Sequence, residues 1–168
     1  MSIVHLGPGA FFRAFGVPWL EDVMAVAGGD WGVTGVSLRS RIVRDKLAAN
    51  GFDYHALERG PGDVTARKVT ALRDVLVAPE DPEKVVDLMA DPEVSIVSLT
   101  ITEKGYCYSH AKGGLDLASP GIVHELANPE QPETAPGFIV AAMAQRRARG
   151  LRLCPTCPAC NRHRLART

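Results

Sequence analysis

The sequence has no long hydrophobic run, no net charge and few cysteines, and each absence excludes a class of protein. No apolar stretch approaches the ~20 residues that a membrane-spanning helix needs. The N-terminus lacks the basic start and the long apolar core of a secretory signal. Four cysteines in 168 residues, three of them crowded near the C-terminus, do not predict a disulfide framework. The sequence therefore predicts a cytoplasmic protein with no membrane partner, long enough for one domain with a real core.

Charge of one sign is missing from the end of the chain. The 19 basic and 19 acidic residues cancel overall, but no Asp or Glu follows Glu133, whereas seven arginines lie between Arg146 and Arg167. A basic end on an acidic body is found in proteins with nucleic-acid-binding tails. The segment is short and unpatterned, so a solvated terminus explains it more simply. We therefore expect no nucleic-acid partner; the alternative requires salt-dependent affinity that disappears without residues 146–168.

The most informative stretch runs from Ser2 to Ala14. A short apolar run, as in a buried parallel strand, ends at Gly7-Pro8-Gly9, and an apolar, helix-compatible segment follows to Ala27. Strand, glycine turn and helix open a dinucleotide-binding βαβ unit, in which the glycines let the backbone approach a pyrophosphate and the helix N-terminus supplies oriented N–H groups. The usual third glycine is missing, because position 12 is Phe. An ordinary strand-to-helix turn is the alternative interpretation.

The succession of strand-like and helix-like segments predicts an α/β fold with a mostly parallel sheet. Beyond the first strand and helix, we expect strands at 31–38 and 93–102, helices at 42–49, 82–90 and 138–148, and a long loop over 109–136 with a short helix at 122–127. Residues 52–57 and 64–77 are typical of an inserted antiparallel hairpin, so we expect the sheet to be mixed. Pro18 predicts a kink or a break in the first helix, whose segment carries Trp19, Leu20, Val23 and Met24 at helical spacing.

The ends of the predicted strands locate a ligand site, because ligands in open α/β sheets bind beyond the carboxyl ends of the strands. In a NAD-binding fold, an Asp or Glu at the end of the second strand holds the adenosine ribose hydroxyls, but this sequence has Ser37, Leu38 and Arg39 there. An arginine at this point favours the 2′-phosphate of NADP, stacks on adenine or faces water, and the sequence leaves these alternatives open. The strand at 93–102 also ends in polar residues.

Three motifs carry a family resemblance that covers residues 2 to about 152. They are Gly7-x-Gly9-x-Phe11-x-Arg13-Ala14, then Asp30-Trp31-Gly32 with the strand that follows it, and Thr100-x-Thr102-Glu103-Lys104-Gly105-Tyr106. On these motifs the chain resembles the long-chain mannitol dehydrogenases, which include mannitol 2-dehydrogenase, fructuronate reductase and tagaturonate reductase. The resemblance implies a Rossmann-like, NAD(P)-binding domain.

The same resemblance implies a metal-free oxidoreductase. Its members transfer a hydride between a sugar alcohol or sugar acid, such as mannitol or mannonate, and the corresponding ketose, with NAD as the expected cofactor here and NADP as the alternative. The cofactor-binding residues that it implies are Gly7, Gly9, Ala10, Phe11, Arg13, Ser37, Arg39, Thr100 and Thr102. Glu103 is implied at the mouth of the active site as an accessory group in proton movement. The alternative for Glu103 is a surface ion pair with Lys104 at the strand end.

The sequence departs from the family pattern after about residue 152. The family continues into a helical domain that carries a catalytic lysine with a neighbouring asparagine and histidine, and no residue of this chain takes those roles. We therefore expect residues 1–152 to form the cofactor-binding domain and residues 153–168 to be an out-of-frame or otherwise aberrant, or a disordered, tail. The helical domain is then absent, and the chain is truncated and catalytically incompetent. The alternative is a non-catalytic dinucleotide- or partner-binding module.

A competing site lies in the tail, at Cys154-x-x-Cys157-x-x-Cys160-x-x-His163. Thiolates and an imidazole at this spacing are able to hold zinc or part of an iron–sulfur cluster. All of these residues fall in one short stretch with prolines between them, whereas structural zinc sites draw pairs of ligands from separate knuckles. We therefore predict no metal site.

Overall fold

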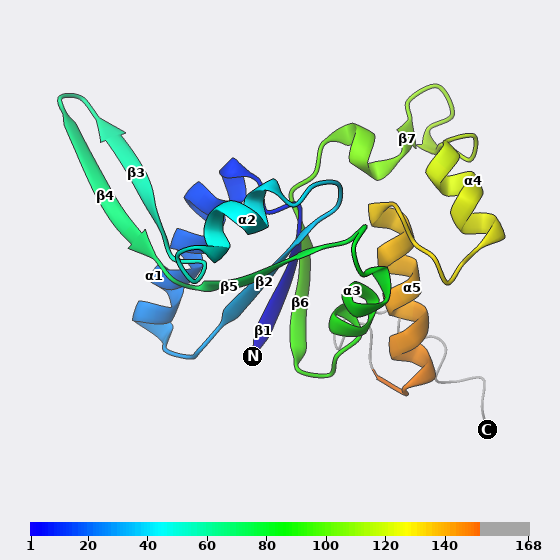
Figure 1. The fold of residues 1–168 in the computed structure, drawn as a ribbon, viewed down its shortest axis with the longest axis horizontal. Coiled ribbons are helices and arrows are strands. Elements are labelled where there is room, and N and C mark those ends of the chain that lie inside the picture. The colour runs from blue at the N-terminus through cyan, green and yellow to red at the C-terminus, as the bar shows by residue number, and fades with distance from the viewer. Residues whose placement is uncertain (152–168) are drawn as a thin grey trace.

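An open parallel sheet forms the centre of residues 1–151, the part of the chain that the computed structural model describes. Its strand order is β5-β2-β1-β6 (Figure 1), with bounds β1 (Ser2–Leu6), β2 (Gly32–Ser37), β5 (Leu72–Val77) and β6 (Val94–Leu99). Leu6 of β1 pairs with Val36 on one side and with Leu99 on the other. The carboxyl ends of these three strands are therefore level, and Gly7, Ser37 and Thr100 follow them at one edge of the sheet.

Helices cover both faces of the sheet (Figure 1), with bounds α1 (Val17–Ala27), α2 (Ile42–Ala48), α3 (Pro82–Met89) and α5 (Ala135–Ala148). Because successive side chains of a strand point to opposite faces, β1 contributes to two cores. Ile3 belongs to the core beneath α1 and α2, whereas Val4 and Leu6 belong to the core beneath α3 and α5, where Phe138 is 1% exposed. The predicted α/β, Rossmann-like class is confirmed.

Side chains cap the N-termini of α3 and α5, and α5 begins at Ala135 rather than at the expected residue 138. Asp81 caps α3 by accepting a hydrogen bond from the N–H of Lys84 at 3.0 Å, and Pro82 occupies the first turn, where no intrahelical N–H is needed. The Thr134 hydroxyl accepts from the N–H of Gly137 at the start of α5. The short helix predicted at 122–127 is α4 (Pro120–Ala127), and no helix within residues 1–151 has the length and apolarity to cross a membrane.

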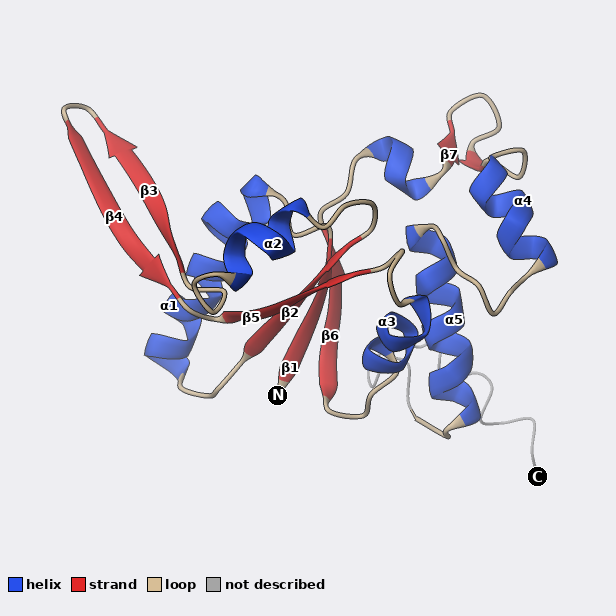
Figure 2. Cartoon of the chain, viewed as in Figure 1, coloured by secondary structure: helices blue, strands red, loops and turns tan. Residues whose placement is uncertain are grey.

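The inserted hairpin is confirmed, but the expected mixed sheet is wrong. Strands β3 (Tyr54–Gly60) and β4 (Asp63–Val69) pair with each other and project away from the sheet (Figure 2). The segment expected as one strand at 64–77 divides into β4 and β5, because the Glu21 carboxylate accepts from the N–H groups of Thr70 and Ala71 at 2.6 and 2.9 Å. These bonds fix the corner, and β5 then joins β2 in parallel.

The first helix changes its winding next to Pro18, where a kink or a break was expected. A π-helical turn, η1 (Phe12–Gly16), runs directly into α1, and Pro18 occupies the first turn of α1. Pro18 has no N–H to donate, and the Arg13 carbonyl accepts instead from the Tyr54 hydroxyl at 2.7 Å. Of the apolar residues at helical spacing, Leu20 and Met24 pack inward, whereas Trp19 is 68% exposed. η1 and α1 thus form one continuous helix. Part of the apolar surface of this helix faces solvent.

Candidate functional site

The level ends of β1, β2 and β6 border a cavity of about 300 Å³. Its lining comes from three loops that follow these strands, at Gly7, Pro8 and Gly9, at Ser37 to Ser40 with Val43, and at Thr100 to Thr102 with Gly105. The chain runs from β1 to β2 on one side and later returns to place β6 on the other side of β1. The cavity therefore lies at the point where the order of strands reverses. In open α/β sheets this switch point is where ligands bind.

The turn after β1 is built around two glycines with different roles. Gly7 has a φ of +83°, and a Cβ there would lie 2.7 Å from the Thr100 carbonyl oxygen, so this position requires glycine. Gly9 donates to the Gly7 carbonyl at 2.6 Å, and a Cβ at Gly9 would meet no atom closer than 3.8 Å. The backbone at Gly9 is therefore bare on its open side. A ligand is able to approach it closely there.

A helix begins at this bare backbone. The N–H of Arg13 bonds to the Gly9 carbonyl at 3.1 Å, so residues 10–12 form the first turn. First-turn N–H groups have no partner within a helix, and the helix dipole places positive charge at this end. The Arg13 guanidinium adds a full positive charge beside the turn, because its Nη1 donates to the Pro8 carbonyl at 2.5 Å. Together these groups make an anion-binding surface.

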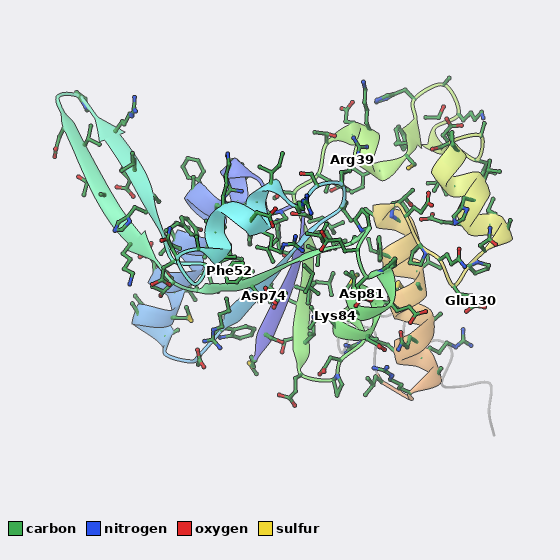
Figure 3. All side chains as sticks on the ribbon, in the orientation of Figure 1. Arg39, Phe52, Asp74, Asp81, Lys84 and Glu130 are labelled. Atoms are coloured by element: carbon green, nitrogen blue, oxygen red, sulfur yellow. The ribbon has the colours of Figure 1, made fainter. Side chains whose placement is uncertain are left out.

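The loop after β2 supplies a second cation. Arg39 is exposed and lines the cavity, at the same end of the sheet as the chain that follows β6 (Figure 3). Within residues 1–151, no Asp or Glu lines this cavity. The second arginine of the loop, Arg41, lies 3.5 Å from the carboxylate of Asp45. The described site therefore has no acidic group to receive ribose hydroxyls and has a free basic side chain in the corresponding loop.

The loop after β6 brings hydroxyl groups to the cavity. The N–H of Thr100 bonds to the Leu6 carbonyl at 3.1 Å, and its hydroxyl donates to the Gly7 carbonyl at 3.0 Å. Thr102 also lines the cavity. Glu103 follows at the start of η2 (Glu103–Tyr106), where its side chain is 86% exposed and lies 3.5 Å from His110 Nε2. Glu103 is thus close in sequence to the cavity without lining it.

The sequence over residues 1–163 matches the Rossmann domain of mannitol dehydrogenases. The chain belongs to the mannitol dehydrogenase family. It is 40% identical to a polyol:NADP oxidoreductase of Gluconobacter oxydans and 38% identical to a D-mannonate oxidoreductase of Escherichia coli, each over 89% of this chain and 32% of the relative. The fold superposes with a TM-score of 0.84 on Pseudomonas fluorescens mannitol 2-dehydrogenase in a ternary complex with NAD and D-mannitol, at 40% identity over 90% of this chain and 32% of that one.

This member of the mannitol dehydrogenase family spans about a third of the length of those relatives. The tail predicted at 153–168, with Cys154, Cys157, Cys160 and His163, lies outside the described residues, and the family match continues into it as far as residue 163. Its assignment as an aberrant tail stays a prediction. Within residues 1–151, no three His, Cys, Asp or Glu residues come together as metal ligands.

The structure brings together most of the predicted site residues of this mannitol dehydrogenase domain. Six of them line one cavity: Gly7, Gly9, Ser37, Arg39, Thr100 and Thr102. Arg13 is tied to the turn beside it. Ala10 belongs to the first helical turn without lining the cavity. Phe11 is 68% exposed and its ring lies 5.3 Å from that of Phe15, on the outer surface of the helix. The cofactor-binding roles of all these residues remain predictions.

Sequence reasoning missed His5, which lies directly beneath the site. The imidazole is 1% exposed, with Nδ1 at 2.8 Å from the Ser98 hydroxyl and Nε2 at 2.8 Å from the Thr100 hydroxyl. Burial lowers the pKa of His5 to about 4, against a smaller opposing effect of the Gly7 carbonyl. The sequence did carry a signal for His5. It is the one titratable and polar side chain in the otherwise apolar run Ile3-Val4-His5-Leu6, which forms a buried strand.

We expect His5 to make the protein less stable in mild acid. Its pKa is about 4 when folded and 6.5 by default when unfolded, so the unfolded state binds the extra proton first as the pH falls. Above pH 6.5 the neutral His5 leaves the free energy of unfolding at its full value. Between pH 6.5 and pH 4 that free energy falls by about 2–3 kcal/mol. Urea unfolding between pH 7.5 and 4.5 measures it. The His5→Phe variant should lack this component, and an identical pH slope in both proteins would contradict the assignment.

Proposed function

We propose that this chain binds a nicotinamide dinucleotide as the cofactor domain of a dehydrogenase that acts on a sugar alcohol or sugar acid. The observation that carries the proposal is the Gly7–Gly9 turn, which leads into a helix N-terminus at the switch point of a parallel sheet. The relatives add support, because one is named for NADP and another was solved with NAD and D-mannitol.

The residues present fit such a cofactor. The cradle at Gly9 is open to solvent, and a side chain there would fill it. The N–H groups of residues 10–12 and the Arg13 guanidinium would hold the pyrophosphate, Arg39 the adenosine side, and Thr100 with Thr102 the nicotinamide side. When bound, the nicotinamide supplies the chemistry of accepting or donating a hydride. The chain itself binds and orients the cofactor through these groups.

Turnover of a substrate needs catalytic groups in addition to the residues that would hold the cofactor. In the family pattern, a lysine takes the alcohol proton while an asparagine and a histidine polarise the developing carbonyl, and no residue of this chain matches them. Glu103, exposed beside the site, is proposed as an accessory group in proton movement. For the isolated chain we therefore propose binding without turnover, as in a non-catalytic dinucleotide-binding module. Reduction of fructose or fructuronate by the purified chain would overturn this part.

A fluorescence titration of the full chain with NADH and NADPH tests the binding proposal. Nicotinamide emission rises when the reduced ring leaves water, so saturable enhancement is expected for at least one cofactor. A useful control is NMNH, which lacks the adenosine half and the pyrophosphate and should bind much more weakly. No saturable change with either dinucleotide would refute the proposal.

The resemblance implies NAD first and NADP as the alternative, but Arg39 is expected to make NADPH the tighter ligand of this chain. A guanidinium forms charge-assisted hydrogen bonds with a 2′-phosphate, whereas the ribose of NADH finds no acidic partner among the described lining residues. The Arg39→Ala variant should lose about tenfold in NADPH affinity and little in NADH affinity. The matched control is Arg59→Ala, which removes a positive charge from the distant hairpin. Equal losses for both cofactors would contradict a role in reading the 2′-phosphate.

A further inference from the structure

A buried chain of hydrogen bonds joins β6 to the glycine turn. It runs from the Ser98 hydroxyl to His5 Nδ1 at 2.8 Å, from His5 Nε2 to the Thr100 hydroxyl at 2.8 Å, and from that hydroxyl to the Gly7 carbonyl at 3.0 Å. His5 lies in the central strand, and its side chain bridges to the neighbouring strand and the loop that follows it. No buried side-chain nitrogen or oxygen of the described residues lacks a hydrogen-bond partner, so this network is complete.

The direction of each hydrogen bond follows from the chemistry of the groups. The Gly7 carbonyl only accepts, so the single Thr100 hydroxyl proton points to it. The Thr100 oxygen then accepts from a protonated His5 Nε2. His5 is neutral in this buried setting, so its Nδ1 is an acceptor and the Ser98 hydroxyl donates to it. One tautomer therefore satisfies every member of the chain.

Phe12, which occupies the position of the third glycine in the usual fingerprint, packs against the imidazole of His5. The Phe12 ring lies parallel to the His5 ring, with centroids 3.3 Å apart and an angle of 4° between the planes. Space for the phenyl ring comes from Gly16, where a Cβ would lie 2.5 Å from Phe12 Cδ2. Gly16, one helical turn after Phe12, thus leaves room for the phenyl ring, and that ring covers one face of the His5 imidazole.

We propose that His5 is a positioning residue for the dinucleotide site, acting as the Nε2–H tautomer through Thr100 on the Gly7 carbonyl. The Gly7 carbonyl accepts from both the Thr100 hydroxyl and the Gly9 N–H, so its two lone pairs are engaged. That double contact fixes the peptide plane between Gly7 and Pro8 and hence the direction of the bare backbone at Gly9. The inference rests on the proposed cofactor binding, whereas the hydrogen-bond chain itself does not.

The first test is the tautomer of His5 in the full chain without cofactor. Imidazole nitrogen NMR at pH 7 is expected to show a protonated Nε2 and a bare Nδ1. Replacing Ser98 with alanine removes the donor to Nδ1 and should move the Nδ1 resonance while leaving Nε2 protonated. A protonated Nδ1 in the unmodified protein would overturn the chain of hydrogen bonds, whatever the protein does with dinucleotides.

The second test compares two His5 variants by NADPH titration. His5→Phe keeps a ring against Phe12 and removes both hydrogen bonds, so we expect affinity to fall about tenfold. His5→Gln places an amide N–H near the Nε2 position and should recover most of that loss. Urea unfolding of both variants corrects for any unfolded fraction. Equal affinities in folded His5→Phe and His5→Gln would overturn the positioning role, and absence of NADPH binding in the unmodified chain would instead overturn the proposed function on which it rests.

Discussion

Replacing Gly7 with alanine is expected to abolish dinucleotide binding and to lower the free energy of unfolding by about 2–4 kcal/mol. An alanine would have to adopt a φ of +83°, which is unfavourable for any residue with a Cβ. The new Cβ would also lie 2.7 Å from the Thr100 carbonyl oxygen and 2.9 Å from Ile101 Cγ2. The Thr100 oxygen belongs to the backbone and cannot rotate away as a side chain would. The turn at Gly7 would therefore have to move away from β6 to remove the collision, and this movement would open the site.

The matched control for this variant is Gly62→Ala at the tip of the hairpin. Gly62 has a similar φ of +89°, but a Cβ there would meet no atom within 4 Å. It therefore carries the backbone strain without the collision, and we expect a loss of about 1 kcal/mol and unchanged NADPH affinity. Urea unfolding and NADPH titration measure both variants. If Gly7→Ala matched Gly62→Ala in both measurements, the close packing of the turn against β6 would be wrong.

Truncation of Phe138 to alanine is expected to cost about 3–5 kcal/mol of stability, a large part of the total for a domain of this size. Phe138 is 1% exposed and lies in the core between α5 and the sheet, with Val4, Leu6 and Val36 among the buried members of the same cluster. The substitution removes the ring from water-excluded contacts and leaves a cavity that the surrounding strands cannot fill.

Phe15→Ala makes the same chemical change on the surface. Phe15 is 64% exposed on the outer side of η1, so we expect its loss to change the free energy of unfolding by no more than about 0.5 kcal/mol. The difference between the two variants in urea unfolding isolates burial from side-chain chemistry. Comparable losses from both would mean that the face at Phe15 is covered in solution, for example by self-association, and a concentration series would reveal that.

The features that were predictable from sequence are those with local signals. The apolar run before Gly7 located β1, the runs after Gly28-Gly29 and after Pro92 located β2 and β6, and Asp81 with Pro82 marks the start of α3. The parallel order follows once these strands are connected through helices, because carboxyl ends then meet at one edge. For the same reason, Gly7, Ser37 and Thr100 were predictable as neighbours.

The features that were missed depend on contacts between distant parts of the chain. The corner between β4 and β5 is made by Glu21 from α1, and nothing local to residues 64–77 reports it. The role of His5 depends on hydroxyls more than 90 residues away in the sequence. Trp19 is exposed although its spacing is typical of a buried helix face, since hydrophobic periodicity does not say how wide the covered stripe is.

Mapping of the dinucleotide on the full chain by amide NMR tests the central claim most directly. On addition of NADPH, we predict the largest shifts at the amides of Gly9, of residues 10–12 and of Arg39, with smaller ones at Thr102. The amide of Gly62, on the projecting hairpin, should not move. Saturable shifts confined to the hairpin or to the outer face of α5, with none at Gly9, would contradict a cofactor site at the ends of β1, β2 and β6.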